Sequence, residues 1–222
     1  MALHSANRGF QLRDEKEKLT LICSHRVNDP SALASTPKRF GVEIDLRSDG
    51  GSLILEHDAF VAGPRFEDWL DSYDHRFIVL NTKEEGLESE IIRILADREI
   101  SDWSFLDQSF PSMVRTLREG ETRTMARISE YESIETIERL PVKPRWIWVD
   151  SFTGVLPDSR TLRTLSDSGF LLMAVSSELQ GRDFERGKAE IVEAFTGAGV
   201  SLAGVCTKRP EAWEQEASRW WA

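Results

Sequence analysis

Two carboxylates on one apolar segment are the first residues in this sequence whose spacing suggests chemistry. Glu43 and Asp45 are two residues apart in FGVEIDL (40–46). Residues two apart on a β-strand point to the same face, so these carboxylates would lie side by side in apolar surroundings. They would repel each other and lose hydration, and a divalent cation with oxygen ligands removes both penalties. Neutralisation of the pair by Arg47 or Lys83 is the alternative.

Nearly all of the remaining apolar segments also end on polar or charged residues. The first segment, LTLIC (19–23), is followed by Ser24 and then by His25 and Arg26. The later segments end on His57-Asp58, Asn81-Thr82-Lys83, Asp107, Arg127, Asp150, Glu178 and Lys208. A single charge after a strand is usually a solvated loop residue. A whole set of such ends would converge if the strands run parallel, because their carboxyl ends then share one rim.

The elements that must position these residues are nine short apolar segments with amphipathic segments between them. The apolar segments are residues 19–23, 40–46, 52–57, 77–81, 103–107, 124–128, 146–150, 170–175 and 201–206. The amphipathic segments, expected to be helices, are residues 84–99, 112–120, 159–169 and 187–199. Nearly unbroken apolar strands that alternate with helices are typical of a parallel sheet covered on both faces.

This pattern predicts an α/β fold of the (β/α)8 TIM-barrel type. Segment 52–57 is interpreted as a minor strand, which leaves eight main strands. A doubly wound open sheet is the alternative, but no glycine-rich phosphate loop follows the first strand. No linker or repeat is visible, so residues 1–222 are expected to form a single domain with its core at about 19–213.

Composition limits the partners and the compartment. The chain has 222 residues, of which 40% are hydrophobic and 30% charged, and its net charge is −10. No basic run appears, which does not favour general nucleic-acid binding. The two cysteines, Cys23 and Cys206, lie in apolar segments and do not indicate a disulfide framework. With a polar start and no stretch of ~18 apolar residues, no signal peptide or membrane span is expected, and a cytoplasmic protein is predicted.

Four motifs taken together resemble one enzyme family. They are His25-Arg26 after the first strand, Glu-x-Asp at 43–45, His57-Asp58, and Lys83 after the third main strand. They are similar to the motifs of glycerophosphodiester phosphodiesterases, within the wider group of barrels that contains phosphatidylinositol-specific phospholipase C. The segment AGVCTKRPEAW (203–213) resembles the last strand of that family, which closes on Thr-x-x-Pro. The likeness runs from about residue 19 to 213, and its specific part is 25–83.

The resemblance implies hydrolysis of a small phosphodiester of glycerol, a polyol or a sugar. His25 and His57 would be the general acid and base, and Arg26 and Lys83 would hold phosphate oxygens. The chemistry needs these residue types, because imidazole exchanges protons near neutrality and cations offset charge on the phosphoryl oxygens. The nucleophile would be water or a neighbouring hydroxyl of the substrate.

The resemblance also implies one divalent cation, Mg²⁺ or Ca²⁺, as the cofactor. Glu43 and Asp45 would be metal ligands. The family has a third carboxylate ligand two residues before the lysine, where this chain has Asn81. An amide oxygen can bind either cation without adding charge, and Asp107 on the next strand is the candidate for the missing charge.

Two further functions remain open. Besides Asn81, the chain has Val27 where the family has glycine after His-Arg, and it lacks the small subdomain usually inserted after the His-Asp pair. Asn81 and Val27 motivate a barrel that has lost turnover and serves as a phosphate-ligand binding or assembly protein. A Schiff-base enzyme that uses Lys83 is the third hypothesis. It requires Lys83 in an apolar pocket, whereas the nearby carboxylates predict the opposite.

Overall fold

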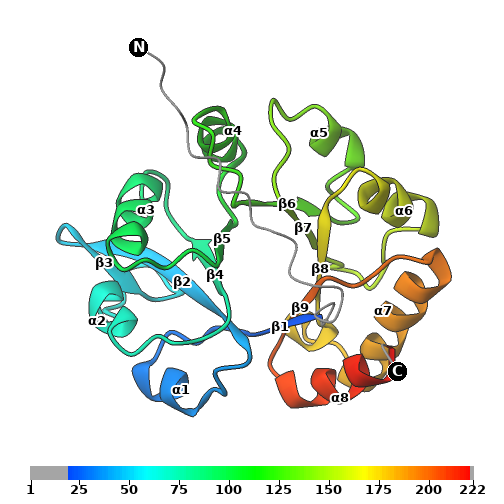
Figure 1. The fold of residues 1–222 in the computed structure, drawn as a ribbon, viewed down its shortest axis with the longest axis horizontal. Helices are drawn as coiled ribbons and strands as arrows, with labels where there is room; N and C mark the ends of the chain where they lie inside the picture. The colour runs from blue at the N-terminus through cyan, green and yellow to red at the C-terminus, as the bar shows by residue number, and fades with distance from the viewer. Residues whose placement is uncertain (1–19, 221–222) are drawn as a thin grey trace.

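A computed structural model describes residues 20–220, and Figure 1 shows strands enclosed by a ring of helices. The strands are β1 (Leu21–Ser24), β2 (Gly41–Asp49), β3 (Ser52–Leu55), β4 (Ile78–Thr82), β5 (Trp103–Leu106), β6 (Met125–Ile128), β7 (Trp146–Val149), β8 (Leu171–Val175) and β9 (Gly204–Thr207). The helices are α1 (Pro30–Ser35), α2 (Phe66–Leu70), α3 (Glu88–Asp97), α4 (Phe110–Arg118), α5 (Ile134–Glu138), α6 (Ser159–Asp167), the 3₁₀ helix η2 (Ser177–Gln180), α7 (Phe184–Ala198) and α8 (Pro210–Trp220).

The strands form one sheet that curls into a barrel. Their order is β5-β4-β2-β1-β9-β8-β7-β6, and β3 pairs with β2 outside this path. β3 is antiparallel to β2, and the other strand pairs are parallel. The end strands β5 and β6 meet through a single parallel bridge between Phe105 and Thr124. The sheet is therefore a nearly closed eight-stranded parallel barrel, and the predicted (β/α)8 fold is confirmed.

Polar side chains reinforce this narrow seam between β5 and β6. On the outer side, Thr124 Oγ1 donates a hydrogen bond to Gln108 Oε1 at 2.7 Å, and Gln108 Nε2 donates to Thr116 Oγ1 at 2.9 Å. Gln108 Nε2 also donates to Glu88 Oε1 at 3.0 Å. The loop after β5 is thereby joined to β6, to α4 and to the start of α3.

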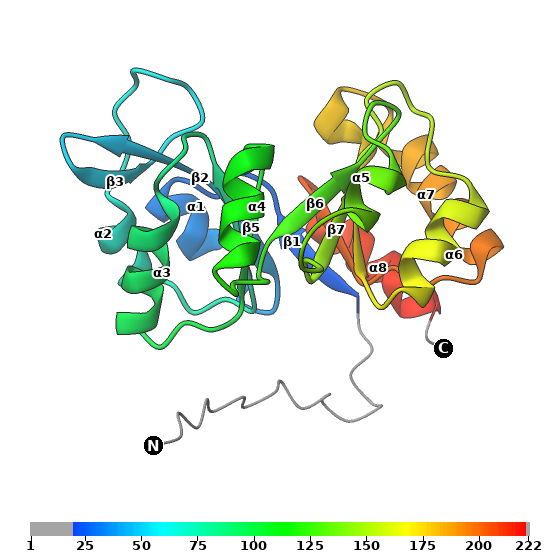
Figure 2. The same ribbon diagram turned by 90° about the horizontal axis from the view of Figure 1, so that it is seen from above.

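The helices lie outside the barrel, as the two views in Figures 1 and 2 show. The four predicted helical segments correspond to α3, α4, α6 and α7. The five-residue helices α2 and α5 were not predicted, because a helix of that length is too short to show a helical repeat of apolar residues. No helix in the part of the chain that the structure describes is long and apolar enough to cross a membrane.

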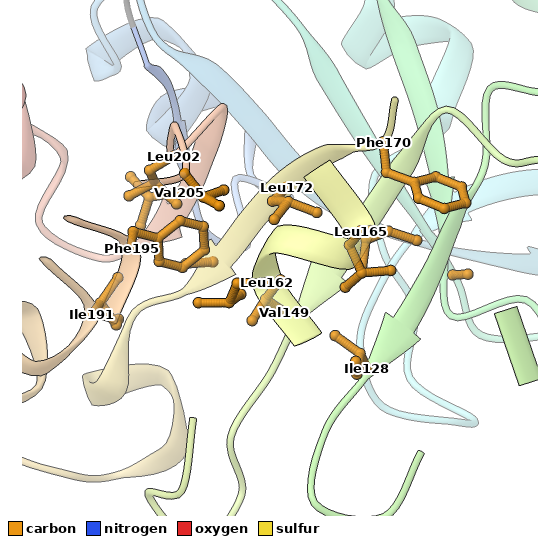
Figure 3. Packing of buried hydrophobic residues seen from close by; sticks show 14 of the residues in the cluster. Ile128, Val149, Leu162, Leu165, Phe170, Leu172, Ile191, Phe195, Leu202 and Val205 are labelled. Atoms are coloured by element: carbon orange, nitrogen blue, oxygen red, sulfur yellow. The ribbon is translucent and has the colours of Figure 1, made fainter. Parts of the chain in front are cut away.

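Apolar packing fills both the outside and the inside of the barrel. A large cluster joins β6–β9 to the helices that cover them, and Figure 3 shows Leu162 and Leu165 of α6 and Phe195 of α7 within it. A separate cluster includes Cys23, Trp146 and Trp148 and contains residues from seven of the main strands. It occupies the interior of the barrel, so the two tryptophans are core residues, as the alternation along β7 indicates.

The register of the strands determines which residues of β2 face the interior. Cys23 is paired with Gly41, and a Cβ atom on Gly41 would lie 2.6 Å from Cys23 Sγ. Gly41 therefore faces the barrel interior at a point where Cys23 leaves no room for a side chain. Since residues two apart share a face, Glu43, Asp45 and Arg47 follow Gly41 along the interior side toward the carboxyl rim.

Candidate active site

Glu43 and Asp45 lie at the centre of the candidate site, near the carboxyl ends of the strands. Each is only 1% exposed to solvent. In the register of β2 and β4, Glu43 is paired with Val79 and Asp45 with Asn81. The two carboxylates therefore share the upper interior of the barrel with Asn81, as the alternation in the sequence predicts.

Glu43 is held by groups from two neighbouring strands. Its Oε1 accepts a hydrogen bond from Asn81 Nδ2 at 3.0 Å, and its Oε2 accepts one from the backbone N–H of Arg26 at 2.7 Å. His25 Nε2 lies 3.8 Å from the same Oε2. Burial, together with the negative charge of Asp45, raises the pKa of Glu43 from 4.5 to about 7. Glu43 therefore keeps its proton to a higher pH than an exposed glutamate does.

Asp45 is the anion on which the cations of the site converge. Lys83 Nζ lies 3.0 Å from Oδ1, and Arg26 Nε lies 3.4 Å from Oδ2. Asn28 pairs with Asp45 twice: its Nδ2 donates to Oδ2, and its Oδ1 accepts from the backbone N–H of Asp45, both at 2.8 Å. The positive charge of Lys83 therefore compensates the negative charge of the carboxylate pair, whereas Arg47 contacts neither carboxylate.

The loop after β1 is held in an unusual conformation that directs Arg26 into the site. Arg26 has a φ of 55°, in the left-handed region that non-glycine residues rarely adopt. Val27 is 3% exposed, donates its N–H to Glu43 O at 2.8 Å and accepts from Trp69 Nε1 at 3.1 Å. Asp29 then caps α1 by accepting from the N–H groups of Ser31 and Ala32. Val27 is thus an anchor of this loop in the core.

His25 is enclosed at the junction of β1 and β9. Its backbone N–H donates to Thr207 O at 2.9 Å, and its side chain is 16% exposed. The buried ring atom Nδ1 has no hydrogen-bond partner among the described residues. Burial and the nearby charge of Arg26 lower the pKa of His25 from 6.5 to about 4. The ring is therefore neutral at pH 7 and able to accept a proton.

His57 reaches the same rim through the β2–β3 ribbon. The backbone N–H of Glu56 donates to Asp45 O at 3.0 Å. His57 follows Glu56 in the chain and therefore lies close to Asp45. Its ring is 39% exposed, and Nδ1 lies 2.7 Å from Asp58 Oδ1. The hydrogen bond from His57 lowers the pKa of Asp58, and the charges of Arg26 and Arg47 lower it further. Asp58 is thus within electrostatic reach of Arg26.

The donor set fits a hard divalent cation in part. Glu43 and Asp45 offer carboxylate oxygens, and the buried Asn81 Oδ1 has no hydrogen-bond partner among the described residues. An unpaired buried amide oxygen is costly, and a cation beside two carboxylates would remove that cost. No group of three or more His, Cys, Asp or Glu side chains in the described chain has metal-ligand geometry, so a site here depends on Asn81.

Asp107 belongs to a different cluster, at the ends of β5, β6 and β7. It forms an ion pair with Arg127 Nη2, while Arg127 Nη1 lies 2.9 Å from Asp150 Oδ2. Gln180 Nε2 donates to Asp150 Oδ1 at 2.9 Å, and the Arg127 guanidinium lies 5.4 Å from the centre of the Phe152 ring. The structure therefore does not bring Asp107 together with Glu43 and Asp45, and its role as a metal ligand stays a prediction.

The sequence did not predict the contacts of three residues near the site. Asn28 orients Asp45, Asp58 contacts the His57 ring, and Arg47 contacts the backbone of His57. Arg47 continues the alternation of Glu43 and Asp45, and that spacing is a signal for a third residue on the same interior face. The pairing of Asn28 with Asp45 has no comparable signal, because it depends on the turn between them.

Comparisons with known proteins agree on the fold. No protein-family model matches the sequence, and no curated protein sequence matches it either. A glycerophosphoryl diester phosphodiesterase from Parabacteroides distasonis superposes with a TM-score of 0.63 at 14% identity, covering 91% of this chain and 87% of that one. A glycerophosphodiester phosphodiesterase from Agrobacterium tumefaciens gives a TM-score of 0.63 at 14% identity, covering 89% and 100%. The chain thus has the barrel fold of these enzymes, as the resemblance of its motifs implied.

Proposed function

We propose that this protein is a metal-dependent phosphodiesterase that hydrolyses a small phosphodiester of glycerol, a polyol or a sugar. The observation that carries the proposal is the clustering of His25, Arg26, Glu43, Asp45 and Lys83 at the carboxyl rim of the barrel. Structural neighbours named as phosphodiesterases share the fold. Neither composition nor fold requires a proton carrier, two carboxylates and two cations at one point, whereas phosphodiester hydrolysis uses all three.

The two histidines divide the proton transfers in this proposal. His25 is neutral at pH 7, because burial and Arg26 lower its pKa, and in this proposal its unprotonated ring takes the proton from the attacking hydroxyl. His57 directs Nδ1 toward Asp58, which leaves Nε2 free to give a proton to the leaving oxygen. The attacking hydroxyl belongs to water or to the substrate itself.

Arg26 and Lys83 supply positive charge for the phosphate. Both lie within 3.4 Å of Asp45, so a buried anion holds them near the site. Charge that develops on the non-bridging oxygens is stabilised by cations held in place before the reaction. Glu43, Asp45 and Asn81 would hold one Mg²⁺ or Ca²⁺, which supplies Lewis-acid stabilisation of the phosphoryl oxygens when bound.

A direct assay tests this proposal. Purified protein is incubated with glycerophosphodiesters that differ in the alcohol, with EDTA, Mg²⁺ or Ca²⁺, and the released alcohol is measured. We expect turnover with a divalent cation, little turnover with EDTA, and loss of turnover in Asp45→Asn. Wild-type protein that releases no alcohol from any diester at millimolar cation would overturn the proposal.

A binding barrel without turnover is the second candidate. The observation in its favour is that Asp45 already contacts Lys83, Arg26 and Asn28, while the third ligand position is a neutral amide. Calorimetric titration with a diester distinguishes the two functions, since binding without product formation supports the second. The Schiff-base hypothesis finds no support in the geometry, because Lys83 Nζ lies 3.0 Å from a carboxylate oxygen and not in an apolar pocket.

A further inference from the structure

β2 is the longest strand of the barrel, and it continues beyond the candidate site to Asp49. Its outer part pairs with β3, and the resulting ribbon extends from the barrel, as Figure 2 shows. Arg47 follows Glu43 and Asp45 on the same strand face, at the base of this ribbon. Its side chain is only 16% exposed, so its charged group lies largely within the protein.

The guanidinium of Arg47 binds the backbone of His57 with two nitrogen atoms. Nε and Nη2 donate to His57 O at 3.2 and 2.9 Å. Nη1 lies 3.5 Å from Glu84 Oε1, which compensates the positive charge. The planar fork of an arginine fixes the direction of such a contact, which a lysine cannot do because its ammonium is a single point of charge.

Glu84 connects this contact to the end of β4, which Lys83 follows. Its Oε2 accepts hydrogen bonds from Ser48 N at 3.2 Å and Ser48 Oγ at 2.6 Å. The backbone N–H of Lys83 donates to Leu46 O at 3.0 Å. The end of β4 and the base of the ribbon therefore form one hydrogen-bonded unit, which Arg47 extends to His57.

On the solvent side, the loop that carries His57 has weaker support. Glu56 Oε1 accepts from the N–H groups of His57 and Asp58 at 2.8 and 3.1 Å, but both contacts lie within the loop itself. Residues 58–62 are exposed, and Phe60 has a φ of 66°. Backbone contacts also hold this loop, because Glu56 N–H donates to Asp45 O at 3.0 Å and Leu55 N–H donates to Pro64 O at 2.9 Å. Among the side-chain hydrogen bonds of the described residues, those of Arg47 are the ones that join the His57 backbone to β2.

We infer that Arg47 is a positioning residue that holds the His57 loop in register with the rest of the site. The inference rests on the proposed function, in which His57 transfers a proton. Arg47 acts through the His57 carbonyl and does not contact the reacting atoms. A displacement of about 1 Å in a catalytic group can reduce the rate by about 10²-fold, so the loss of this contact should appear in kcat.

The test compares substitutions of Arg47 with identical substitutions of a matched arginine. Arg98 is 30% exposed, donates to the backbone carbonyl of Glu67 at 3.4 Å and pairs with Asp71 at 3.5 Å, on the outer helices. Arg47→Met, Arg47→Lys, Arg98→Met and Arg98→Lys are assayed for kcat and KM. Amide hydrogen exchange of residues 56–62 and thermal unfolding are measured in parallel.

We expect Arg47→Met to lower kcat by about 10–100-fold with KM nearly unchanged, and to accelerate exchange of the His57 and Asp58 amides. Arg47→Lys keeps the charge but not the fork, so it should resemble Arg47→Met. The Arg98 variants should retain wild-type kcat and wild-type exchange in 56–62. If Arg47→Met does not fold, Glu84→Gln provides the same test with a smaller effect, since it removes the charge that faces Nη1 while its amide oxygen can still accept from Ser48.

Three outcomes would overturn the inference. They are unchanged exchange in residues 56–62, a loss of kcat that Arg98→Met matches, and a rise in KM with kcat preserved, which would mean that Arg47 binds the substrate directly. Failure of the proposed function is recognised separately, because the wild type itself would then hydrolyse no diester. The exchange data would still decide whether Arg47 orders the loop.

Discussion

Folding shifts the pKa values of Glu43 and His25 in opposite directions, although the two side chains lie 3.8 Å apart. Burial and Asp45 raise the pKa of Glu43 from 4.5 to about 7, and burial and Arg26 lower the pKa of His25 from 6.5 to about 4. Between pH 4.5 and 7, native Glu43 keeps a proton that the unfolded state loses, so its contribution to stability falls as pH rises. Between pH 4 and 6.5, unfolded His25 binds a proton that the native state lacks, so its contribution rises. The two slopes largely offset each other.

This opposition predicts what single substitutions do to the pH dependence of stability in metal-free buffer. In Glu43→Gln, the His25 slope remains, so the free energy of unfolding should rise with pH between about 4 and 6.5 more steeply than in wild type. In His25→Gln, the Glu43 slope remains, and stability should fall between about 4.5 and 7 relative to wild type. Urea denaturation at closely spaced pH values measures both. Parallel curves for all three proteins would contradict the assigned pKa shifts.

The roles of the two histidines predict a large and non-additive effect on turnover. His25→Ala and His57→Ala should each lower kcat by about 10²–10⁴-fold, because each removes a positioned proton carrier. The double variant should lose less than the product of the two, since the residues act as a unit. Steady-state kinetics with folded variants, checked by circular dichroism, provides the measurement.

His75 is the internal control for this prediction. It precedes β4, at the amino end of the barrel, and its Nε2 contacts Thr36 O at 2.9 Å. His75→Ala should leave kcat nearly unchanged. If it reduced kcat as much as His25→Ala, the assay would report stability, and the two-histidine mechanism would lose its support.

At the scale of elements, the seam between β5 and β6 depends on side chains more than on the backbone. One bridge joins the two strands, and Arg127 links the ends of β5, β6 and β7 through Asp107 and Asp150. Asp150 is 2% exposed, so removal of Arg127 would leave a buried carboxylate without its cation. Breaking one side of a buried ion pair costs more than the pair contributes.

We therefore predict that Arg127→Met lowers the free energy of unfolding by about 3 kcal/mol. Adding Asp150→Asn should recover part of that loss, because the buried charge is then removed as well. As a control, Arg186→Met, which removes an 81% exposed partner of Glu190, should cost no more than about 1 kcal/mol. Denaturant unfolding measures all three. Equal losses for Arg127→Met and Arg186→Met would mean that the seam does not depend on this ion pair.

For the whole molecule, binding of the proposed cation should appear as added stability. A ligand that binds only the native state stabilises it by about 2.7 kcal/mol at a concentration of 100 times its Kd. We predict that Mg²⁺ or Ca²⁺ raises the Tm of wild type by several degrees and that EDTA reverses the change. Asp45→Asn and Asn81→Leu should lose the metal-dependent part of the shift. Asp107→Asn tests the remaining predicted ligand: a lost shift would add Asp107 to the site, and a retained shift would leave it as a partner of Arg127. A shift retained in Asp45→Asn would place the cation elsewhere.

The sequence by itself determined the barrel and the rim that carries the candidate site. Each main strand is a short apolar run whose period and end are local properties, and the parallel direction of the strands in one barrel places all their carboxyl ends on one side. The shared face of Glu43 and Asp45 also follows from local geometry, since strand residues two apart point the same way. The positions of His25, Arg26 and Lys83 near these carboxylates could also be predicted, because they follow the carboxyl ends of strands that share one rim.

Only the tertiary structure decided which of these groups contact one another. Asp107 pairs with Arg127 and not with Glu43, because strand order and barrel curvature place β6 and β7 beside it. Arg47 turns toward the His57 carbonyl because the β2–β3 ribbon brings that residue back to the same strand. The raised pKa of Glu43 likewise depends on burial by residues distant in the chain. Contacts and burial arise from packing between elements, and a linear pattern of residue types does not encode those distances.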